Sequence, residues 1–250
     1  MEVENNIYSE SQLQALDQNK IPYHVAIVMD GNRRWAKKNN FGYLEGHRKG
    51  AENLTSIIKA AAALGIKILT VFAFSTENRN RSGQEVSALM SLFRAYLSKY
   101  TIILKNENVR LRLIGDIAKL PTSLKKTFDK SIEETKDCNK IDLVVAINYG
   151  GRDEITRAVK NIVTDYNQKK IEKSMITEEL ISSYLDTAAW PDPDLLIRTS
   201  GELRLSNLLL WQMSYAEFYA VDAFWPEFSE MHLYKAILEY QKRERRFGKT

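Results

Sequence analysis

Short apolar runs rich in β-branched residues alternate with longer segments of helical periodicity, and this alternation is the strongest constraint on the fold. The runs predict strands at 24–29, 66–75, 109–115, 141–150, 195–201 and 218–224. Helical spacing of apolar residues predicts helices at 47–64, 84–104, 121–137, 153–168, 177–185, 206–217 and 229–247. Strands that alternate with helices predict an α/β fold with a central parallel β-sheet flanked by helices.

The chain is expected to form a single domain. No Pro/Gly/Ser-rich linker divides the 250 residues, so we expect a peripheral N-terminal arm at 1–20 and one domain at 21–250. Cys138 is the sole cysteine, which excludes an intramolecular disulfide and fits a reducing compartment. The acidic N-terminus does not resemble a signal peptide, and no apolar stretch approaches the ~18 residues of a membrane span. These features predict a cytoplasmic protein.

The charge pattern argues against a nucleic-acid partner. The formal net charge is only +4, and 36 Lys and Arg residues are interleaved with 32 Asp and Glu residues. A nucleic-acid-binding protein usually gathers its basic residues into one face or stripe. The chain also lacks a P-loop, a G-x-G-x-x-G motif, a C-x-x-C motif and a G-x-S-x-G elbow. The excess of positive charge gives weak support for small anionic partners.

Polar residues follow the first predicted strand, at the edge where parallel sheets bind ligands. They are Asp30, Gly31, Asn32, Arg33, Arg34 and Trp35. Asp30 suits Mg²⁺, which binds few protein carboxylates together with phosphate oxygens. Gly31 permits a close backbone approach, and the helix start that follows favours an anion. The segment could hold a diphosphate, or Asp30 and Asn32 could simply cap the helix.

Two further strand ends carry polar side chains. The second strand is followed by Ser75, Thr76, Glu77, Asn78, Arg79, Asn80 and Arg81, which form either a solvated loop or part of a site. The fifth strand carries Arg198 and is followed by Arg204, Leu205 and Ser206. Arginine makes forked contacts to phosphate oxygens, so these arginines could grip one diphosphate. The alternative is ion pairing with Glu202 or Asp194.

Two isolated side chains are also candidates. Glu217 lies among aromatic residues, and a carboxylate in an apolar setting needs a partner, which could be a metal or an arginine. His47 lies near the predicted start of a helix, where an anion would be favoured. A single histidine is nevertheless more often structural than functional.

Six segments, taken in order, closely resemble the cis-prenyltransferases, a family that includes the undecaprenyl diphosphate synthases. They are HVAIVMDGNRRWA (24–36), Gly46-His47, FAFSTENRNR (72–81), INYGGR (147–152), DLLIRTSGELRLSN (194–207) and LLWQMSYAEFY (209–219). The resemblance runs from about residue 21 to Phe247. It implies one catalytic α/β domain at 21–250, a homodimer, and an apolar tunnel for a growing prenyl chain.

The resemblance also implies the reaction. Isopentenyl diphosphate would be condensed with an allylic diphosphate, farnesyl diphosphate in particular, to a long-chain polyprenyl diphosphate. The implied product is undecaprenyl diphosphate for the cell-wall carrier lipid, with Mg²⁺ as cofactor. A peripheral contact with a membrane would serve product release. The aspartate-rich D-D-x-x-D cluster of the trans-type prenyl synthases is absent from the sequence.

Residue roles follow from the same resemblance. Asp30 would bind Mg²⁺ and assist departure of the allylic diphosphate, and Glu217 would complete the metal site, from the same or a neighbouring subunit. The allylic diphosphate would be bound by Gly31, Asn32, Arg33, Arg34 and His47, with Trp35 beside it. Asn78 aligns with the residue proposed as proton acceptor, with Ser75, Thr76 and Glu77 beside it. Isopentenyl diphosphate would be held by Arg81, Arg198, Arg204, Leu205 and Ser206.

Some positions depart from the family pattern. Tyr43 stands where arginine is common, Arg79 where tryptophan is common, and Leu203 where some bacterial members carry histidine. These departures bear on substrate preference more than on activity. In the helix at 84–104, the candidates for lining the tunnel are Ala88, Leu89, Leu92 and Phe93, although ordinary core packing explains each of them equally well.

Two other functions are compatible with parts of the sequence. Some relatives are non-catalytic subunits that support an active partner, but such proteins tend to lose the Asp-Gly-Asn motif and the arginines that this chain retains. A phosphohydrolase could use the same anion site and would release phosphate without forming a prenyl product.

Overall fold

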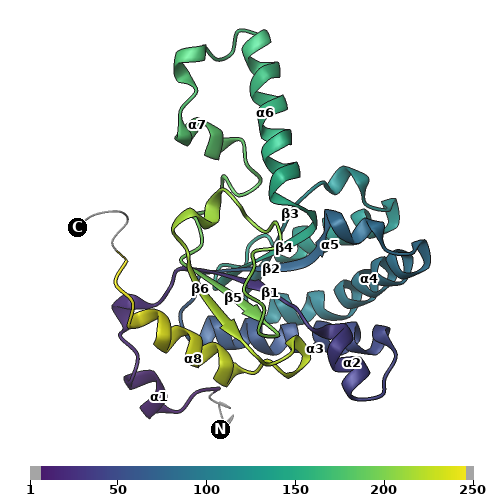
Figure 1. Ribbon diagram of the computed structural model, residues 1–250, viewed down its shortest axis with the longest axis vertical. Helices are drawn as coiled ribbons and strands as arrows, with labels where there is room; N and C mark the ends of the chain where they lie inside the picture. Colours follow the sequence, from purple (N-terminus) through teal and green to yellow (C-terminus); the bar gives the residue numbers. More distant parts are fainter. Residues whose placement is uncertain (1–6, 246–250) are drawn as a thin grey trace.

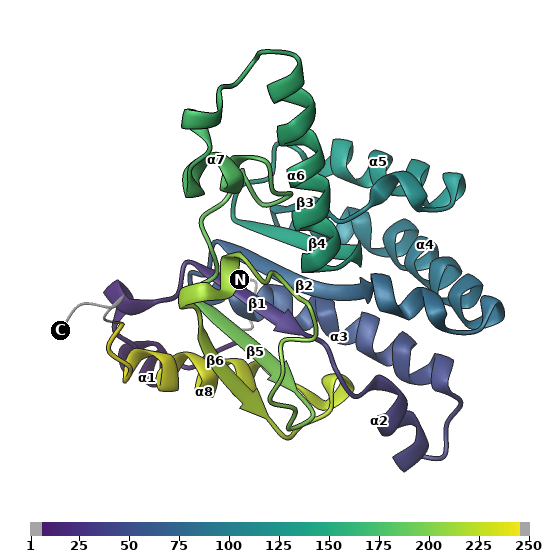
Figure 2. The ribbon, with the colours of Figure 1, turned by 45° about the horizontal axis from the view of Figure 1, so that its top comes forward.

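A computed structural model describes residues 7–245 and contains one six-stranded, all-parallel β-sheet (Figures 1 and 2). The strands are β1 (His24–Val28), β2 (Ile68–Ser75), β3 (Val109–Ile114), β4 (Ile141–Tyr149), β5 (Leu195–Thr199) and β6 (Glu217–Val221). Their order in the sheet is β3-β4-β2-β1-β5-β6. The predicted α/β fold with a parallel sheet is therefore confirmed. The first strand lies in the middle of the sheet, between β2 and β5.

Eight α-helices accompany the sheet within residues 7–245. They are α1 (Glu10–Gln14), α2 (Asn32–Lys38), α3 (Tyr43–Ala63), α4 (Gly83–Asn106), α5 (Thr122–Thr135), α6 (Gly151–Asn167), α7 (Glu178–Ser183) and α8 (Glu230–Gln241). Residues of α3, α4, α5 and α8 pack on one face of the sheet in a common core. The helices α6 and α7 extend away from the body of the molecule (Figure 1).

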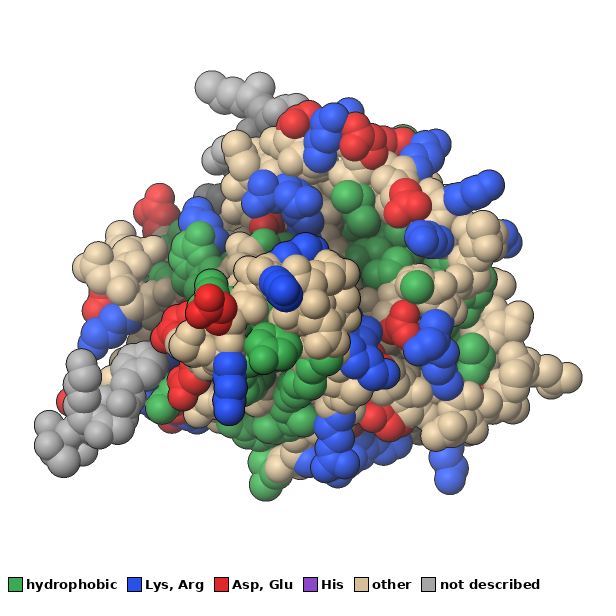
Figure 3. Space-filling model, turned by 90° about the horizontal axis from the view of Figure 1, so that it is seen from above, with side chains coloured by type: hydrophobic (Ala, Val, Ile, Leu, Met, Phe, Trp, Pro, Cys, Tyr) green, Lys and Arg blue, Asp and Glu red, His purple; other side chains and the backbone are tan. Residues whose placement is uncertain are grey.

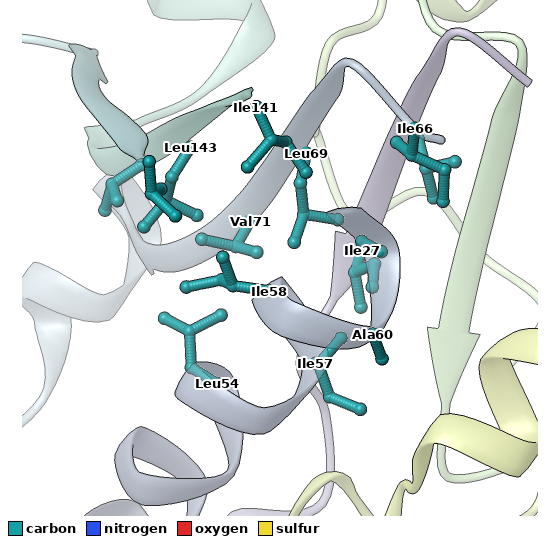
Figure 4. Packing of buried hydrophobic residues seen from close by; sticks show 14 of the residues in the cluster. Ile27, Leu54, Ile57, Ile58, Ala60, Ile66, Leu69, Val71, Ile141 and Leu143 are labelled. Atoms are coloured by element: carbon teal, nitrogen blue, oxygen red, sulfur yellow. The ribbon is translucent and has the colours of Figure 1, made fainter. Parts of the chain in front are cut away.

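The main core forms where alternate strand residues meet helix α3. Leu54 and Ile58 of α3 point toward Val71 of β2 (Figure 4), and Ile57 and Ile27 belong to the same cluster. Because side chains alternate along a strand, the intervening residues face the other side of the sheet. There, Ala26 and Val28 belong to a second, smaller cluster. The central strands are buried on both faces, as is typical of parallel sheets.

The helix predicted at 206–217 is wrong. Its apolar residues Leu208, Leu209 and Met213 are buried in the smaller cluster, so their spacing reflects packing against the sheet. Three residues of the segment, Ser206, Asn207 and Leu209, have positive φ and cannot continue a helix. A short 3-10 helix at Gln212–Tyr215 follows, and β6 begins at Glu217.

The described part of the N-terminal segment packs against α8. Tyr8 and Leu16 are buried in the main core, and the Tyr8 hydroxyl donates to the Glu230 carbonyl at 3.2 Å. The Tyr234 hydroxyl of α8 donates to the Gln12 carbonyl at 2.9 Å. The final helix, predicted at 229–247, ends at Gln241, and residues 246–250 lie outside the described part of the chain.

The surface carries charges of both signs. Figure 3 shows Lys and Arg side chains interspersed with Asp and Glu on one face, without a continuous basic stripe. In the described range 7–245, none of the helices combines the length and the apolar character that crossing a bilayer requires.

The packing around α3 predicts a large loss of stability on truncation. Ile58 is only 1% exposed, so Ile58→Ala should lower the free energy of unfolding by about 2–5 kcal/mol through lost burial and a new cavity. Val159→Ala is the matched control, because Val159 is 50% exposed on α6; it should cost about 0.5 kcal/mol or less. Urea unfolding measures both, and equal costs would contradict the assignment of the core.

Candidate active site

The carboxyl ends of β1, β2 and β5 meet at one edge of the sheet, and a cavity of about 290 Å³ opens there. Polar side chains from three strand ends and from α3 line its mouth. They are Asp30, Asn32, His47, Ser75, Asn78, Arg81, Arg198 and Ser206. The structure therefore brings together eight of the residues that the sequence singled out.

Arg198 and Asp30 form the centre of this mouth. Arg198 is only 3% exposed, and its guanidinium donates to Asp30 Oδ2 at 2.8 Å. The same guanidinium donates to Ser206 Oγ at 2.7 Å and to the Arg204 carbonyl. Partial burial alone would raise the pKa of Asp30, but the hydrogen bond and charge of Arg198, together with the charge of Arg34, lower it. Asp30 is therefore an ionised carboxylate at the cavity mouth.

The turn after β1 requires glycine. Gly31 has φ +99°, and a Cβ there would lie 2.1 Å from Ser200 Oγ. Gly31 is the N-cap of α2, and no side chain caps that helix. Asp30 and Asn32 are thus not helix caps, which removes the alternative interpretation of this segment.

Two carboxylates organise the arginines around the mouth. Glu202 accepts from Arg34 at 2.8 Å and also pairs with Arg204, so the ion pair considered for Arg204 is present. Glu85, in the first turn of α4, is buried and pairs with Arg81 at 3.0 Å and with Arg33 at 3.4 Å.

Glu85 was missed by the sequence analysis. Its one sequence signal is its position four residues after Arg81, the spacing of a helical ion pair.

The segment after β2 is ordered by its own side chains. It forms a 3-10 helix, Thr76–Asn80, closed by a capping box in which Ser75 Oγ accepts from the Asn78 N–H at 3.3 Å. In return, Asn78 Oδ1 accepts from the Ser75 N–H at 3.4 Å. The adjoining Glu77 Oε1 accepts from the Asn207 amide at 2.7 Å. This segment is therefore an ordered 3-10 helix, and its Ser75, Asn78 and Arg81 line the cavity.

Several buried polar atoms at the mouth have no hydrogen-bond partner within the described residues. They are Asn32 Oδ1, His47 Nε2 and Arg198 Nε. An unpaired buried donor or acceptor costs free energy, so such a group usually marks a ligand position. Two of the atoms, His47 Nε2 and Arg198 Nε, can donate to an anion. The cluster fits a polar, anionic ligand such as a diphosphate.

Beyond the mouth, the cavity is apolar. It continues between the sheet and helices α3, α4 and α5, where it is lined by Leu54, Leu89, Leu92, Phe93, Leu97, Leu104, Leu111, Phe128, Leu143 and Val145. Of the four residues suggested for the tunnel, Leu89, Leu92 and Phe93 line the cavity, whereas Ala88 is not among its lining residues. The register of β2 shifts between Phe72 and Ser75, and such a bulge re-aims side chains next to a site.

Glu217 lies at the amino end of its strand, on the side of the sheet opposite to the carboxyl ends that form the cavity mouth. It starts β6, whereas Asp30 follows the end of β1, and the strands are parallel. Five residues of strand separate the two levels, roughly 16 Å at the usual rise. Glu217 instead accepts from Arg243 at 2.9 Å, so an arginine is its partner within the chain. A site containing both Asp30 and Glu217 would need the Glu217 of a second copy.

The remaining candidate residues are not among those that line the cavity. Gly31 is buried, whereas Arg33, Arg34, Glu77, Arg204 and Leu205 are exposed, and Trp35 and Thr76 are partly buried. The departures from the family pattern also have contacts. Arg33 lies over the Tyr43 ring at 5.4 Å, and Arg79 donates to Asn148 at the end of β4. Leu203 is fully on the surface.

The residues around Asp30 fit a magnesium ion only in company with a substrate. Among the described residues, no group of three or more His, Cys, Asp or Glu side chains could hold a metal. Asp30 offers one ionised carboxylate, which suits Mg²⁺ when phosphate oxygens and water complete its octahedral shell.

His47 predicts a specific response to anions. Burial, with a smaller effect of the nearby Arg81 charge, lowers the pKa of His47 to about 4. Inorganic diphosphate in the mouth would stabilise the imidazolium and should raise that pKa. His24 is the matched control, because burial lowers its pKa to about 4 too, but both its nitrogens bond within the core. NMR titration of the imidazole resonances measures both; a parallel shift of His24 and His47 would contradict this site.

Residues 28–248 match the family model described as putative undecaprenyl diphosphate synthase. The chain is 49% identical over 233 residues to an isoprenyl transferase of Chlamydia muridarum, covering 92% of each chain. It superimposes on lavandulyl diphosphate synthase from Lavandula x intermedia, in complex with dimethylallyl diphosphate, with TM-score 0.90 and 35% identity, covering 92% of this chain and 100% of the other. A probable undecaprenyl diphosphate synthase from Campylobacter jejuni gives TM-score 0.77 and 35% identity, covering 91% and 99%. The resemblance seen in the motifs is confirmed: the chain belongs to the undecaprenyl diphosphate synthase family of prenyltransferases.

Proposed function

We propose that this protein is a cis-prenyltransferase that condenses isopentenyl diphosphate with an allylic diphosphate, with farnesyl diphosphate as the starter. The supporting observation is a single cavity whose mouth is lined by arginines and unpaired polar atoms and whose interior is apolar. Such a cavity suits an amphipathic molecule with a diphosphate head and a hydrocarbon tail. The proposed product is a long-chain polyprenyl diphosphate, with undecaprenyl diphosphate for the cell-wall carrier lipid as the specific candidate.

The allylic diphosphate would lie at the turn after β1. Arg33 and Arg34 lie in the first turn of α2 directly after it, Asn32 and His47 line the cavity, and Gly31 lets the backbone approach closely. Breaking the allylic carbon–oxygen bond leaves its electron pair on the diphosphate and a cation on the carbon chain. Fixed positive groups stabilise the leaving group most as its charge develops, which lowers the barrier to ionisation.

Isopentenyl diphosphate would be held on the other side of the mouth by Arg81, Arg198, Arg204 and Ser206. Its double bond attacks the allylic carbon, and a proton then leaves the new chain. The Asn78 amide is a poor base, and its Oδ1 already accepts the Ser75 N–H. We therefore assign proton removal to a diphosphate oxygen, with Asn78 positioning the substrate.

Mg²⁺ is the proposed cofactor, with Asp30 as its ligand from this chain. When bound, the ion would supply positive charge to the diphosphate oxygens. Asp30 now pairs with Arg198 at 2.8 Å and Arg34 at 3.3 Å. Those two arginines hold the carboxylate ionised and aimed at the mouth. Glu217 would join the metal site only from a second copy, which is consistent with a proposed homodimer.

The enzyme would act as one catalytic domain in the cytoplasm, in contact with a membrane surface. Residues 21–250 would form the catalytic domain, and the arm predicted at 1–20 is not wholly peripheral, because its Tyr8 and Leu16 are buried in the main core. The single cysteine fits a cytoplasmic location, and release of a long apolar product favours peripheral contact with a membrane.

Asp30 should be essential for turnover. The purified protein, farnesyl diphosphate, radiolabelled isopentenyl diphosphate and Mg²⁺ should yield an extractable prenyl product. Asp30→Ala should lower kcat at least about 100-fold, because the metal ligand and the partner of Arg198 are both lost. Asp129→Ala is the control, since Asp129 is exposed on the outer side of α5.

Other results of the same assay would distinguish a phosphohydrolase from a non-catalytic supporting subunit. Release of phosphate or diphosphate without a prenyl product would replace the proposal with a phosphohydrolase. No reaction with any starter would favour a supporting subunit, and activity would then depend on an added partner chain.

Bulk inside the cavity should limit product length. Leu97 lines the apolar part and is 4% exposed, whereas Ile102 on the same helix is 66% exposed. Leu97→Phe should shift the products toward shorter chains by about one or more isoprene units, because the cavity fills earlier. Ile102→Phe should leave the distribution unchanged. Thin-layer chromatography of the dephosphorylated lipids compares them, and an identical pattern for both variants would argue against this route for the chain.

A further inference from the structure

Asn207 connects three segments at the carboxyl edge of the sheet. Its side-chain amide donates to Glu77 Oε1 at 2.7 Å, in the segment after β2. Its Oδ1 accepts from the Arg152 N–H at 3.0 Å, and its carbonyl accepts from the Gly151 N–H at 2.7 Å, both at the start of α6. Asn207 itself directly follows Ser206 in the loop after β5.

These bonds make Asn207 the cap of a distant helix. The residue before α6 is Gly150, which has no side chain to accept the free N–H groups of the first turn. Asn207 supplies two acceptors from another part of the chain, as a capping side chain would locally. Its backbone is left-handed, with φ +65°, a conformation that asparagine tolerates better than most residues.

The fit around this cap is tight. A Cβ on Gly150 would lie 2.7 Å from the Asn207 amide nitrogen and 2.5 Å from Thr76 Oγ1. A side chain at position 150 would therefore displace both loops. The absence of one lets the segments after β2, β4 and β5 meet around a single amide.

We propose that Asn207 is a positioning residue for isopentenyl diphosphate, an inference that rests on the function proposed above. It fixes the separation between the 3-10 helix Thr76–Asn80, which leads to Arg81, and the loop that carries Arg204 and Ser206. These are the residues assigned to that substrate. The side chains assigned to the allylic diphosphate come from the β1–α2 turn, α2 and α3, and within residues 7–245 Asn207 makes no hydrogen bond to them.

A selective effect on the affinity for one of the two substrates would distinguish this positioning role from a purely structural one. A residue that only caps α6 would lower thermal stability and affect both substrates alike when it is changed. A positioning residue weakens one substrate and spares the other. Asn207→Asp provides the test, because it keeps the acceptor for the Arg152 N–H but places a carboxylate against Glu77.

The experiment measures binding of each substrate alone by calorimetry, so that it does not depend on turnover. Asn207→Asp should weaken isopentenyl diphosphate roughly tenfold, because a hydrogen bond becomes a contact between like charges. Farnesyl diphosphate should change by less than about twofold. In the double variant Asn207→Asp with Glu77→Gln, the glutamine amide can donate to the new carboxylate. This reversed hydrogen bond should recover most of the lost affinity, and Glu77→Gln alone completes the cycle.

Two further variants control for backbone and stability effects. Asn207→Gly accepts the left-handed backbone but removes both side-chain bonds, and it should show the same selectivity. Asn108→Asp alters another left-handed asparagine, φ 57°, whose amide bonds Asn139 at the amino end of β3, away from the mouth. It should lower the melting temperature without changing either affinity.

Several results would overturn the inference. They are equal losses for both substrates, a change in melting temperature alone, or a double variant that binds no better than Asn207→Asp. The proposed function is judged separately, by whether the unaltered protein makes a prenyl product. Selective loss of isopentenyl diphosphate affinity without turnover in the parent protein would retain the role of Asn207 and reject the enzyme.

Discussion

The cavity mouth depends on one buried cation. Arg198 lies on β5, between β1 and β6, and is almost fully buried, and a buried charge is costly unless it is paired and hydrogen-bonded. Asp30 supplies the counter-charge, and Ser206 with the Arg204 carbonyl supplies further acceptors. To provide these partners, the turn after β1 and the loop after β5 must both fold over the strand end. The requirement to neutralise Arg198 therefore shapes the turn and the loop that carry most of the proposed substrate contacts.

Some buried polar atoms at the cavity mouth have no hydrogen-bond partner among the described residues, and two of them are donors that an anion could satisfy. Arg198 Nε, His47 Nε2 and Asn32 Oδ1 are buried without partners, at a cost to stability that an apolar replacement would avoid. Burial and nearby positive charge keep His47 neutral near pH 7, since its pKa is lowered to about 4. An anionic ligand would accept hydrogen bonds from Arg198 Nε and His47 Nε2, whereas Asn32 Oδ1 is an acceptor and needs a donor. Unpaired groups fixed before the ligand arrives need little reorganisation, which is the property that makes them effective in binding and catalysis.

Sequence reasoning succeeded where a pattern has one physical cause. Buried parallel strands leave continuous apolar runs, and polar residues that follow them must meet at one edge of the sheet; the predicted sheet and the clustering of Asp30, Asn78 and Arg198 follow from this. Sequence reasoning failed at 206–217, where the packing of an irregular segment gives its apolar residues a spacing that resembles that of a helix. The spacing of Leu208, Leu209 and Met213 looks helical, but it arises from an irregular segment on the second face of the sheet. Glu85 and Asn207 were not predicted as site residues, because their importance lies in contacts between segments, which spacing along the chain does not reveal.

Helix α4 links the two halves of the cavity. Its first turn carries Glu85, which holds Arg81 and Arg33, and its later turns carry Leu97 and Leu104 along the apolar interior. Under the proposed function, the diphosphate head stays at the mouth while the tail lengthens into that interior. Each buried CH₂ group is worth about 0.8 kcal/mol, so elongation is favoured until the apolar volume is filled. Further growth would then have to displace close-packed side chains, which is unfavourable. Under this proposal the same helix anchors the charged end and bounds the apolar end, so its position relative to the sheet would govern both substrate binding and the length at which growth stops.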